Sequence, residues 1–189
     1  MTQHPSTQDP RRQQIVERAY QVFARYGYGR TTMRDLAEAA GLSRPGLYLV
    51  FPGKDQVFDA VIGWMGNQAL RQLREEVAAL PDLYSQLHHA CLQWVLRGRR
   101  VEQSYPDAAD FFNTQFDSVA RLYRQVQDYL AELIAPHTGQ GNASAAQLAR
   151  LLSTSLRAIK VEARDETDLE HLIALQVRLL VASLPSGVP

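Results

Sequence analysis

Two very short helical patterns, separated by a glycine, follow one another within the segment 33–51. The first pattern ends at Gly41 after about two turns, and Ser43 can cap the second. Two such helices can cross steeply through a tight turn only if the residues at the crossing are small or tolerate unusual backbone angles. Ala37 and Gly41 meet this requirement, so this segment constrains the fold more than any other part of the sequence.

The spacing within this segment matches the packing pattern of a helix-turn-helix. Counted from Met33 as the first position, Ala37 is fifth, Gly41 ninth, Leu47 fifteenth and Val50 eighteenth. If these residues stood alone, a pair of ordinary core helices joined by glycine would be the better interpretation.

The surrounding residues extend the pattern to a family signature. The run from Thr32 to Lys54, TMRDLAEAAGLSRPGLYLVFPGK, resembles the DNA-binding signature of the TetR family of regulators. The resemblance covers about residues 12–62, and the remainder resembles the family only in length and helical content. It implies a three-helix DNA-binding head over residues 1–54. A helix would join this head to a helical effector-binding and dimerisation domain over residues 55–189, with about nine helices in all.

Apolar residues recur with helical spacing along most of the chain, which independently predicts an all-α fold. Asp9-Pro10 predicts the start of the first helix, which runs to about Tyr26 and is stopped by Gly27. No alternating strand pattern competes with the helical one. After the long apolar-periodic stretch that begins at Lys54, further helices are predicted at about 82–98, 104–117, 119–135, 144–162 and 166–184.

The resemblance also implies which residues of the head contact DNA. The counterpart of Tyr48 hydrogen-bonds a phosphate, and Lys54 corresponds to a lysine that family members aim at the DNA backbone. A solvated surface lysine is the alternative for Lys54. Arg44, Pro45 and Gly46 fall in the first turn of the recognition helix, which enters the major groove in this motif.

Arg44 is the leading candidate for reading a base, although it could equally bind a phosphate. Its guanidinium can pair with guanine O6 and N7, a contact worth about 1–3 kcal/mol of discrimination. Gly46 either allows close approach of the backbone to DNA or adapts the helix to the groove. Many relatives have histidine or an aromatic residue in place of Val50, so no DNA contact is expected there.

Three further residues complete the predicted contact set. Arg34 matches a position that reaches DNA in some family members, and the Thr32 hydroxyl suits a phosphate. A surface arginine and a plain N-cap are the alternatives for these two residues. Ser43, which caps the recognition helix, is the third.

The distribution of charge supports a DNA-binding head, although the net charge of the chain is zero. Residues 1–54 hold eight basic and four acidic side chains, which is net +4, so the remaining residues are net −4. A basic head that faces phosphates and an acidic body that need not touch DNA would show this asymmetry.

The C-terminal part suggests a dimer interface and a ligand pocket. The last two helical patterns are the candidates for dimerisation, because the second is apolar on more than one face. The alternative is that this helix is a central helix buried within the monomer. Central aromatic and polar residues mark where an apolar effector would bind, each being individually also a core candidate. The predicted pocket residues are Trp64, Tyr84, His88, Trp94, Phe112, Phe116 and Tyr123.

The resemblance to the TetR family implies a homodimeric repressor that leaves a palindromic double-stranded operator when a small molecule binds. A constitutive DNA-binding regulator without an effector pocket is the alternative, and an enzyme would need convergent polar residues that the sequence lacks. Cys91 is the single cysteine, and the adjacent histidines at 88–89 project about 100° apart on a helix, so neither a metal nor a cofactor is expected. The polar N-terminus and the lack of a long apolar run predict a cytoplasmic protein without a membrane span.

Overall fold

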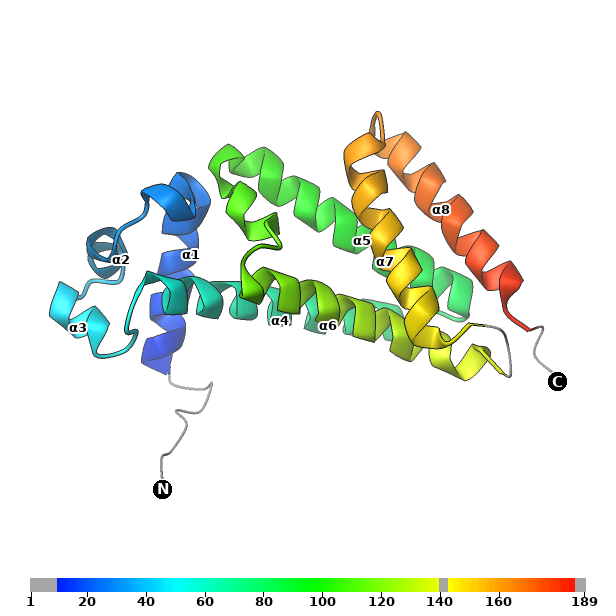
Figure 1. The fold of residues 1–189 in the computed structure, drawn as a ribbon, viewed down its shortest axis with the longest axis horizontal. Helices are drawn as coiled ribbons and strands as arrows, with labels where there is room; N and C mark the ends of the chain where they lie inside the picture. The colour runs from blue at the N-terminus through cyan, green and yellow to red at the C-terminus, as the bar shows by residue number, and fades with distance from the viewer. Residues whose placement is uncertain (1–9, 140–142, 186–189) are drawn as a thin grey trace, which may run out of the picture. The chain divides into compact units, whose positions relative to one another are not determined.

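A computed structural model describes residues 10–139 and 143–185, and this part of the chain contains helices but no strand (Figure 1). The predicted all-α fold is therefore confirmed, whereas Asp9, the predicted cap of the first helix, lies outside the described residues. The α-helices are α1 (Pro10–Arg30), α2 (Met33–Ala39), α3 (Arg44–Tyr48), α4 (Lys54–Ala78), α5 (Leu83–Ser104), α6 (Asp117–Ile134), α7 (Ala145–Glu162) and α8 (Glu166–Ser183). The 3-10 helices are η1 (Pro106–Phe112) and η2 (Ala135–His137).

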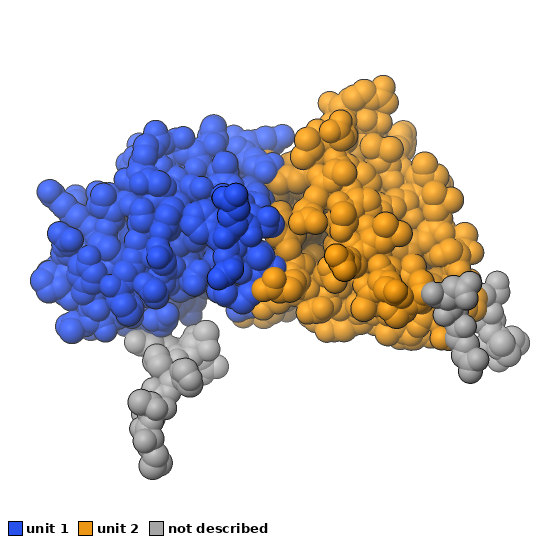
Figure 2. All heavy atoms as spheres, in the orientation of Figure 1, with its two compact units in different colours: residues 1–67, 101–122 blue, residues 68–100, 123–189 orange. Residues whose placement is uncertain are grey.

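The contacts within the chain define two compact units, coloured separately in Figure 2. Unit 1 consists of the described residues up to Asn67 together with Val101–Leu122, and unit 2 of Gln68–Arg100 together with the described residues from Tyr123 onward. Unit 1 therefore contains α1 to α3, the first part of α4 and all of η1. The predicted boundary after residue 54 separates a DNA-binding from an effector-binding domain, which these contacts do not test, so it stays a prediction.

Helix α1 is interrupted at Gly27, next to the residue where the sequence predicted its end. Gly27 has φ 71° and ψ 164°, and one more helical turn follows it. A Cβ added to Gly27 would lie 2.9 Å from the carbonyl oxygen of Asp107 in η1, so both the backbone angles and the close approach require glycine. The N–H of Tyr28 donates to Asp110 Oδ2 at 2.8 Å, and Arg30 pairs with Asp107 at 2.5 Å. The break in α1 is thus the place where η1 docks.

The segment 104–117 differs from its predicted helix. Helix α5 continues through Gly98 to Ser104, and only Pro106–Phe112 forms a helix after it, of the 3-10 type. Pro106 has no N–H to continue α5, which explains the end of that helix. A single glycine in a helix costs only about 1 kcal/mol relative to alanine, so Gly98 does not stop α5.

Aromatic side chains form the core of unit 1. The ring of Phe58 in α4 meets Phe23 of α1 edge-on at 5.2 Å and Phe116 at 4.9 Å between centroids. Tyr28 packs against both Phe58 and Phe116, at 5.1 and 4.9 Å between centroids. Such pairs contribute about 0.5–1.5 kcal/mol each beyond the burial of their area, so this cluster holds the end of α1 firmly against α4.

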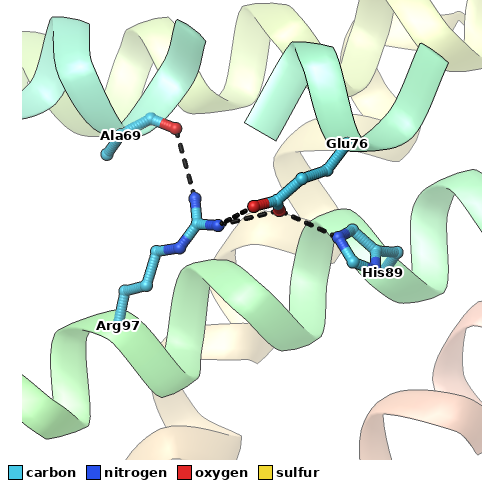
Figure 3. A network of polar contacts seen from close by, with 4 residues as sticks. All are labelled: Ala69, Glu76, His89 and Arg97. Atoms are coloured by element: carbon cyan, nitrogen blue, oxygen red, sulfur yellow. Dashed lines mark hydrogen bonds and ion pairs between the residues drawn. The ribbon is translucent and has the colours of Figure 1, made fainter. Parts of the chain in front are cut away.

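A polar network in unit 2 joins the second part of α4 to α5 (Figure 3). Arg97 Nη2 donates to both carboxylate oxygens of Glu76 at 2.7 Å, and Nη1 donates to the carbonyl oxygen of Ala69 at 3.3 Å. His89 Nε2 lies 2.9 Å from Glu76 Oε2. The hydrogen bond with His89 and then the charge of Arg97 lower the pKa of Glu76.

Candidate nucleic-acid interface

The turn between α2 and α3 depends on Gly41, whose φ is 67°. Its N–H donates to the carbonyl oxygen of Glu38 at 3.0 Å, and the N–H of Leu42 donates to that of Ala37 at 2.9 Å, which closes the C-terminus of α2. Ala37 and Leu47 are both buried, as the helix-turn-helix spacing predicts. Residues 33–51 therefore form the expected pair of crossing helices.

Thr32 is the N-cap of α2. Its Oγ1 accepts a hydrogen bond from the N–H of Asp35 at 3.3 Å, while the Asp35 carboxylate accepts from the N–H and the hydroxyl of Thr32 at 2.9 and 2.7 Å. The side-chain hydrogen bond from Thr32 is the main cause that lowers the pKa of Asp35. A cap of this kind stabilises a helix by about 1 kcal/mol. Thr32 and Arg34 are both exposed, so the cap leaves this end of α2 open to solvent.

Ser43 caps α3, and this cap explains Gly46. Ser43 Oγ accepts a hydrogen bond from the N–H of Gly46 at 3.1 Å. A Cβ added to Gly46 would also lie 3.1 Å from that oxygen, which is tighter than most contacts of real Cβ atoms. Gly46 therefore makes room for the capping hydroxyl, a role that the sequence did not reveal.

Helix α3 and its C-cap carry four exposed residues, which flank the buried Leu47 in the sequence. These residues, Arg44, Pro45, Tyr48 and Leu49, are called the recognition face below. The Arg44 guanidinium lies 5.6 Å from the centroid of the Tyr48 ring, with Nη2 3.5 Å from the phenol oxygen. The structure thus gathers three of the predicted DNA-contact residues on one surface and adds Leu49 to them.

Lys54 makes a contact that the sequence did not predict. Its Nζ donates to the carbonyl oxygen of Tyr28 at 2.8 Å and lies 4.1 Å from the centroid of the Tyr28 ring. The Tyr28 hydroxyl bonds to Asp55, and burial followed by this hydrogen bond raises the pKa of Tyr28 to about 12. In this arrangement Lys54 joins the start of α4 to the interrupted end of α1.

Arg12 is a residue of the head that sequence reasoning missed. Its Nη1 donates to the carbonyl oxygen of Val50 at 3.2 Å, and its guanidinium lies 4.0 Å above the centroid of the buried Phe51 ring. Arg12 therefore connects α1 to the segment that directly follows α3. The partners are 38 positions apart, so no local spacing in the sequence could have indicated this contact.

The predicted pocket residues divide between the two units. Trp64, Phe112 and Phe116 belong to unit 1. In unit 2, the rings of Tyr84 and His88 stack at 5.7 Å, and those of Trp94 and Tyr123 meet edge-on at 6.3 Å. Buried ring nitrogens of Trp64 (Nε1) and His88 (Nε2) lack a hydrogen-bond partner in the described part of the chain. A ligand pocket stays a prediction.

The described residues also bear on metal ligation, thiol chemistry and membrane insertion. They include no group of three or more His, Cys, Asp or Glu side chains that could hold a metal ion. Cys91 is buried, and burial raises the pKa of its thiol to about 12. None of the described helices is long and apolar enough to span a membrane.

Several similarities to known proteins cover only part of the chain. Residues 15–61 match the family of bacterial regulatory proteins called the TetR family. The probable acrEF/envCD operon repressor of Escherichia coli K12 is 37% identical over 65 residues, which are 34% of this chain and 29% of that protein. The chain thus spans about three tenths of the length of the curated relatives that it matches in this way.

Two other similarities extend over most of the chain. The HTH-type transcriptional repressor ComR of Escherichia coli K12 is 24% identical over 177 residues, which are 87% of this chain and 84% of ComR. The crystal structure of a TetR transcription regulator from Haloarcula marismortui has a TM-score of 0.67 at 17% identity and covers 93% of this chain and 98% of its own. These proteins are named as regulators and not as enzymes, in agreement with the prediction. Residues 15–61, which include the helix-turn-helix, are thus similar to the TetR family of bacterial regulatory proteins.

Proposed function

We propose that the chain is a transcriptional repressor that binds double-stranded DNA through the recognition face of α3. The observation that carries this proposal is the exposure of Arg44 and Tyr48 on α3, a helix whose Leu47 is buried. Entry into the major groove requires a helix that packs against the protein on one side and is exposed on another. The repressor ComR, which is similar over most of the chain, supports the same function.

Electrostatics supports DNA as the partner of the head. Residues 1–54 carry a net charge of +4, and Arg34 and Arg44 are both exposed. Each phosphate that a basic side chain neutralises releases counterions, so the affinity would fall steeply as the salt concentration rises. The acidic remainder of the chain would not compete for the same partner.

The repressor would act as a homodimer on a palindromic operator. Two recognition helices about 34–36 Å apart are needed to read successive faces of the major groove, and two-fold symmetry provides them. Helices α7 and α8 offer a surface for dimerisation because they leave large apolar side chains in solvent: Leu151, Val161, Leu175 and Leu179. Covering these side chains would be favourable, since apolar area removed from water contributes about 25 cal/mol per Å².

A small molecule bound to the C-terminal domain would release the repressor from DNA. His88 Nε2 in unit 2 supports this part of the proposal, because a buried polar atom without a partner costs free energy that a ligand could recover. Ligand binding would change DNA affinity only if the two conformations of the repressor differ in their affinity for the ligand.

DNA binding can be tested on the full-length chain with a pool of duplexes that carry a randomised segment. Selected duplexes would then be titrated at fixed salt by fluorescence anisotropy against the wild type, Tyr48→Phe and Arg44→Ala. We expect both variants to bind more weakly and Arg44→Ala also to select a different sequence. Arg71→Ala is the matched control, since Arg71 is exposed on α4 in unit 2. The proposal would be contradicted if the pool yielded no preferred sequence, or if Arg71→Ala and Arg44→Ala lost DNA affinity equally.

A further inference from the structure

Leu49 is a feature of the recognition face that phosphate binding does not explain. This residue is the C-cap of α3, and 89% of its surface is exposed. A scattered exposed leucine needs no explanation on most protein surfaces. Leu49, however, lies beside Tyr48, on the surface that the proposed function turns toward DNA.

The backbone around Leu49 is held in place although its side chain is free. The N–H of Leu49 donates to the carbonyl oxygen of Pro45 at 3.2 Å, which makes Leu49 part of the last turn of α3. Directly after it, the carbonyl oxygen of Val50 accepts a hydrogen bond from Arg12, and the buried Phe51 ring lies under the same guanidinium. Leu49 therefore projects its isobutyl group into solvent from an anchored position.

The chemistry of the major groove determines what such a side chain can recognise. A leucine neither donates nor accepts hydrogen bonds, so it gains nothing from phosphates or from the polar edges of the bases. The 5-methyl group of thymine is the apolar feature that the major groove presents. On the recognition face, Arg44 supplies a donor, Tyr48 a hydroxyl and Leu49 an apolar group.

We infer that Leu49 determines operator specificity by contacting the 5-methyl group of a thymine in each half-site. The inference rests on the proposed function, because it assigns a partner to a residue of the same surface. It requires a thymine in the half-site that the side chains of α3 contact, and it predicts that the contribution of this thymine comes from its methyl group.

Deoxyuridine provides the direct test, because it removes only the methyl group of thymine and keeps its hydrogen-bonding groups. A duplex selected by the full-length chain would be resynthesised with deoxyuridine at one thymine at a time and titrated by fluorescence anisotropy. We expect one position in each half-site at which this replacement weakens wild-type binding about fivefold. Leu49→Ala should weaken binding to the thymine duplex by a similar factor and should lose all sensitivity to deoxyuridine at that position.

Two controls separate this role from a general weakening. Leu49→Met keeps an apolar side chain and should keep the sensitivity to deoxyuridine. The slope of log K against log salt concentration should be the same for Leu49→Ala and the wild type, because no phosphate contact is removed. Melting curves should also coincide, since Leu49 is exposed and contributes little buried area.

The possible outcomes distinguish this inference from the proposed function. If deoxyuridine has no effect at any thymine, or if Leu49→Ala remains as sensitive to it as the wild type, the inference is overturned while sequence-specific DNA binding stands. If the randomised pool yields no preferred sequence, the proposed function is overturned and the inference with it.

Discussion

Replacing Gly27 with alanine is expected to destabilise the protein by about 3–5 kcal/mol. At φ 71° and ψ 164°, Gly27 occupies a region of backbone space that is almost confined to glycine, and another residue there costs about 1–3 kcal/mol. The added methyl group would lie 2.9 Å from the carbonyl oxygen of Asp107, so η1 would have to move away. That movement would weaken the hydrogen bond from the N–H of Tyr28 to the Asp110 carboxylate, a type of bond worth about 1.5–3 kcal/mol.

The free energy of unfolding of Gly27→Ala would be measured by urea denaturation and the midpoint by calorimetry. For a chain of this length, 1 kcal/mol corresponds to about 2–4 °C, so Tm should fall by about 6–20 °C. Gly29→Ala is a close control, because Gly29 is helical and nothing lies within 4 Å of a Cβ added there. Alanine at that position should be neutral or stabilise the chain by up to about 1 kcal/mol. A change below about 0.5 kcal/mol in Gly27→Ala, or equal losses in both variants, would refute the argument.

Three other predictions concern different parts of the molecule. Arg12→Ala should weaken DNA binding several-fold, because the segment after α3 loses its hydrogen bond at Val50. Arg12→Lys should weaken DNA binding to a similar extent, whereas Arg18→Ala, on the same helix, should leave the DNA affinity unchanged. Leu179→Glu should convert a dimer into a monomer of 21.3 kDa in light scattering, and a wild-type chain that already has this mass would contradict the proposed dimer. Because the folded-state pKa of Glu76 is lowered, its stabilising effect should be complete above the ordinary value of 4.5 and disappear as the pH falls through the folded-state value. Urea denaturation between about pH 3 and 7 should therefore show the wild type and Glu76→Gln converging in acid, and a constant difference would refute this.

The elements of the head were predictable because the signals for them are local. Ala37, Gly41 and Leu47 lie within eleven positions, and the residue type at each position indicates its backbone or packing requirement. Gly27 marked the break in α1 for the same reason. These requirements follow from backbone angles and side-chain size, which do not depend on the rest of the fold.

The contacts that hold the head together were not predictable in this way. Lys54 reaches Tyr28 across 26 positions, and Asp110 reaches the same residue across 82. Such pairings depend on which elements the fold brings together, and an isolated lysine or aspartate in a sequence does not indicate its partner. The 3-10 helix η1 was predicted as an ordinary helix because its docking on Gly27 is likewise a long-range effect.

The close approach of Gly46 to Ser43 restricts how the operator preference of this protein can change. A side chain at position 46 would press on the hydroxyl that caps α3, which would have to shift by a few tenths of an ångström, so a substitution there strains the cap as well as changing the contacts of the helix. Arg44 and Leu49 carry no such restriction, because both are exposed and neither supports the fold through its side chain. Divergence of operator sequence among descendants of this protein, or its redesign in the laboratory, should therefore begin at the two ends of α3 and spare its middle.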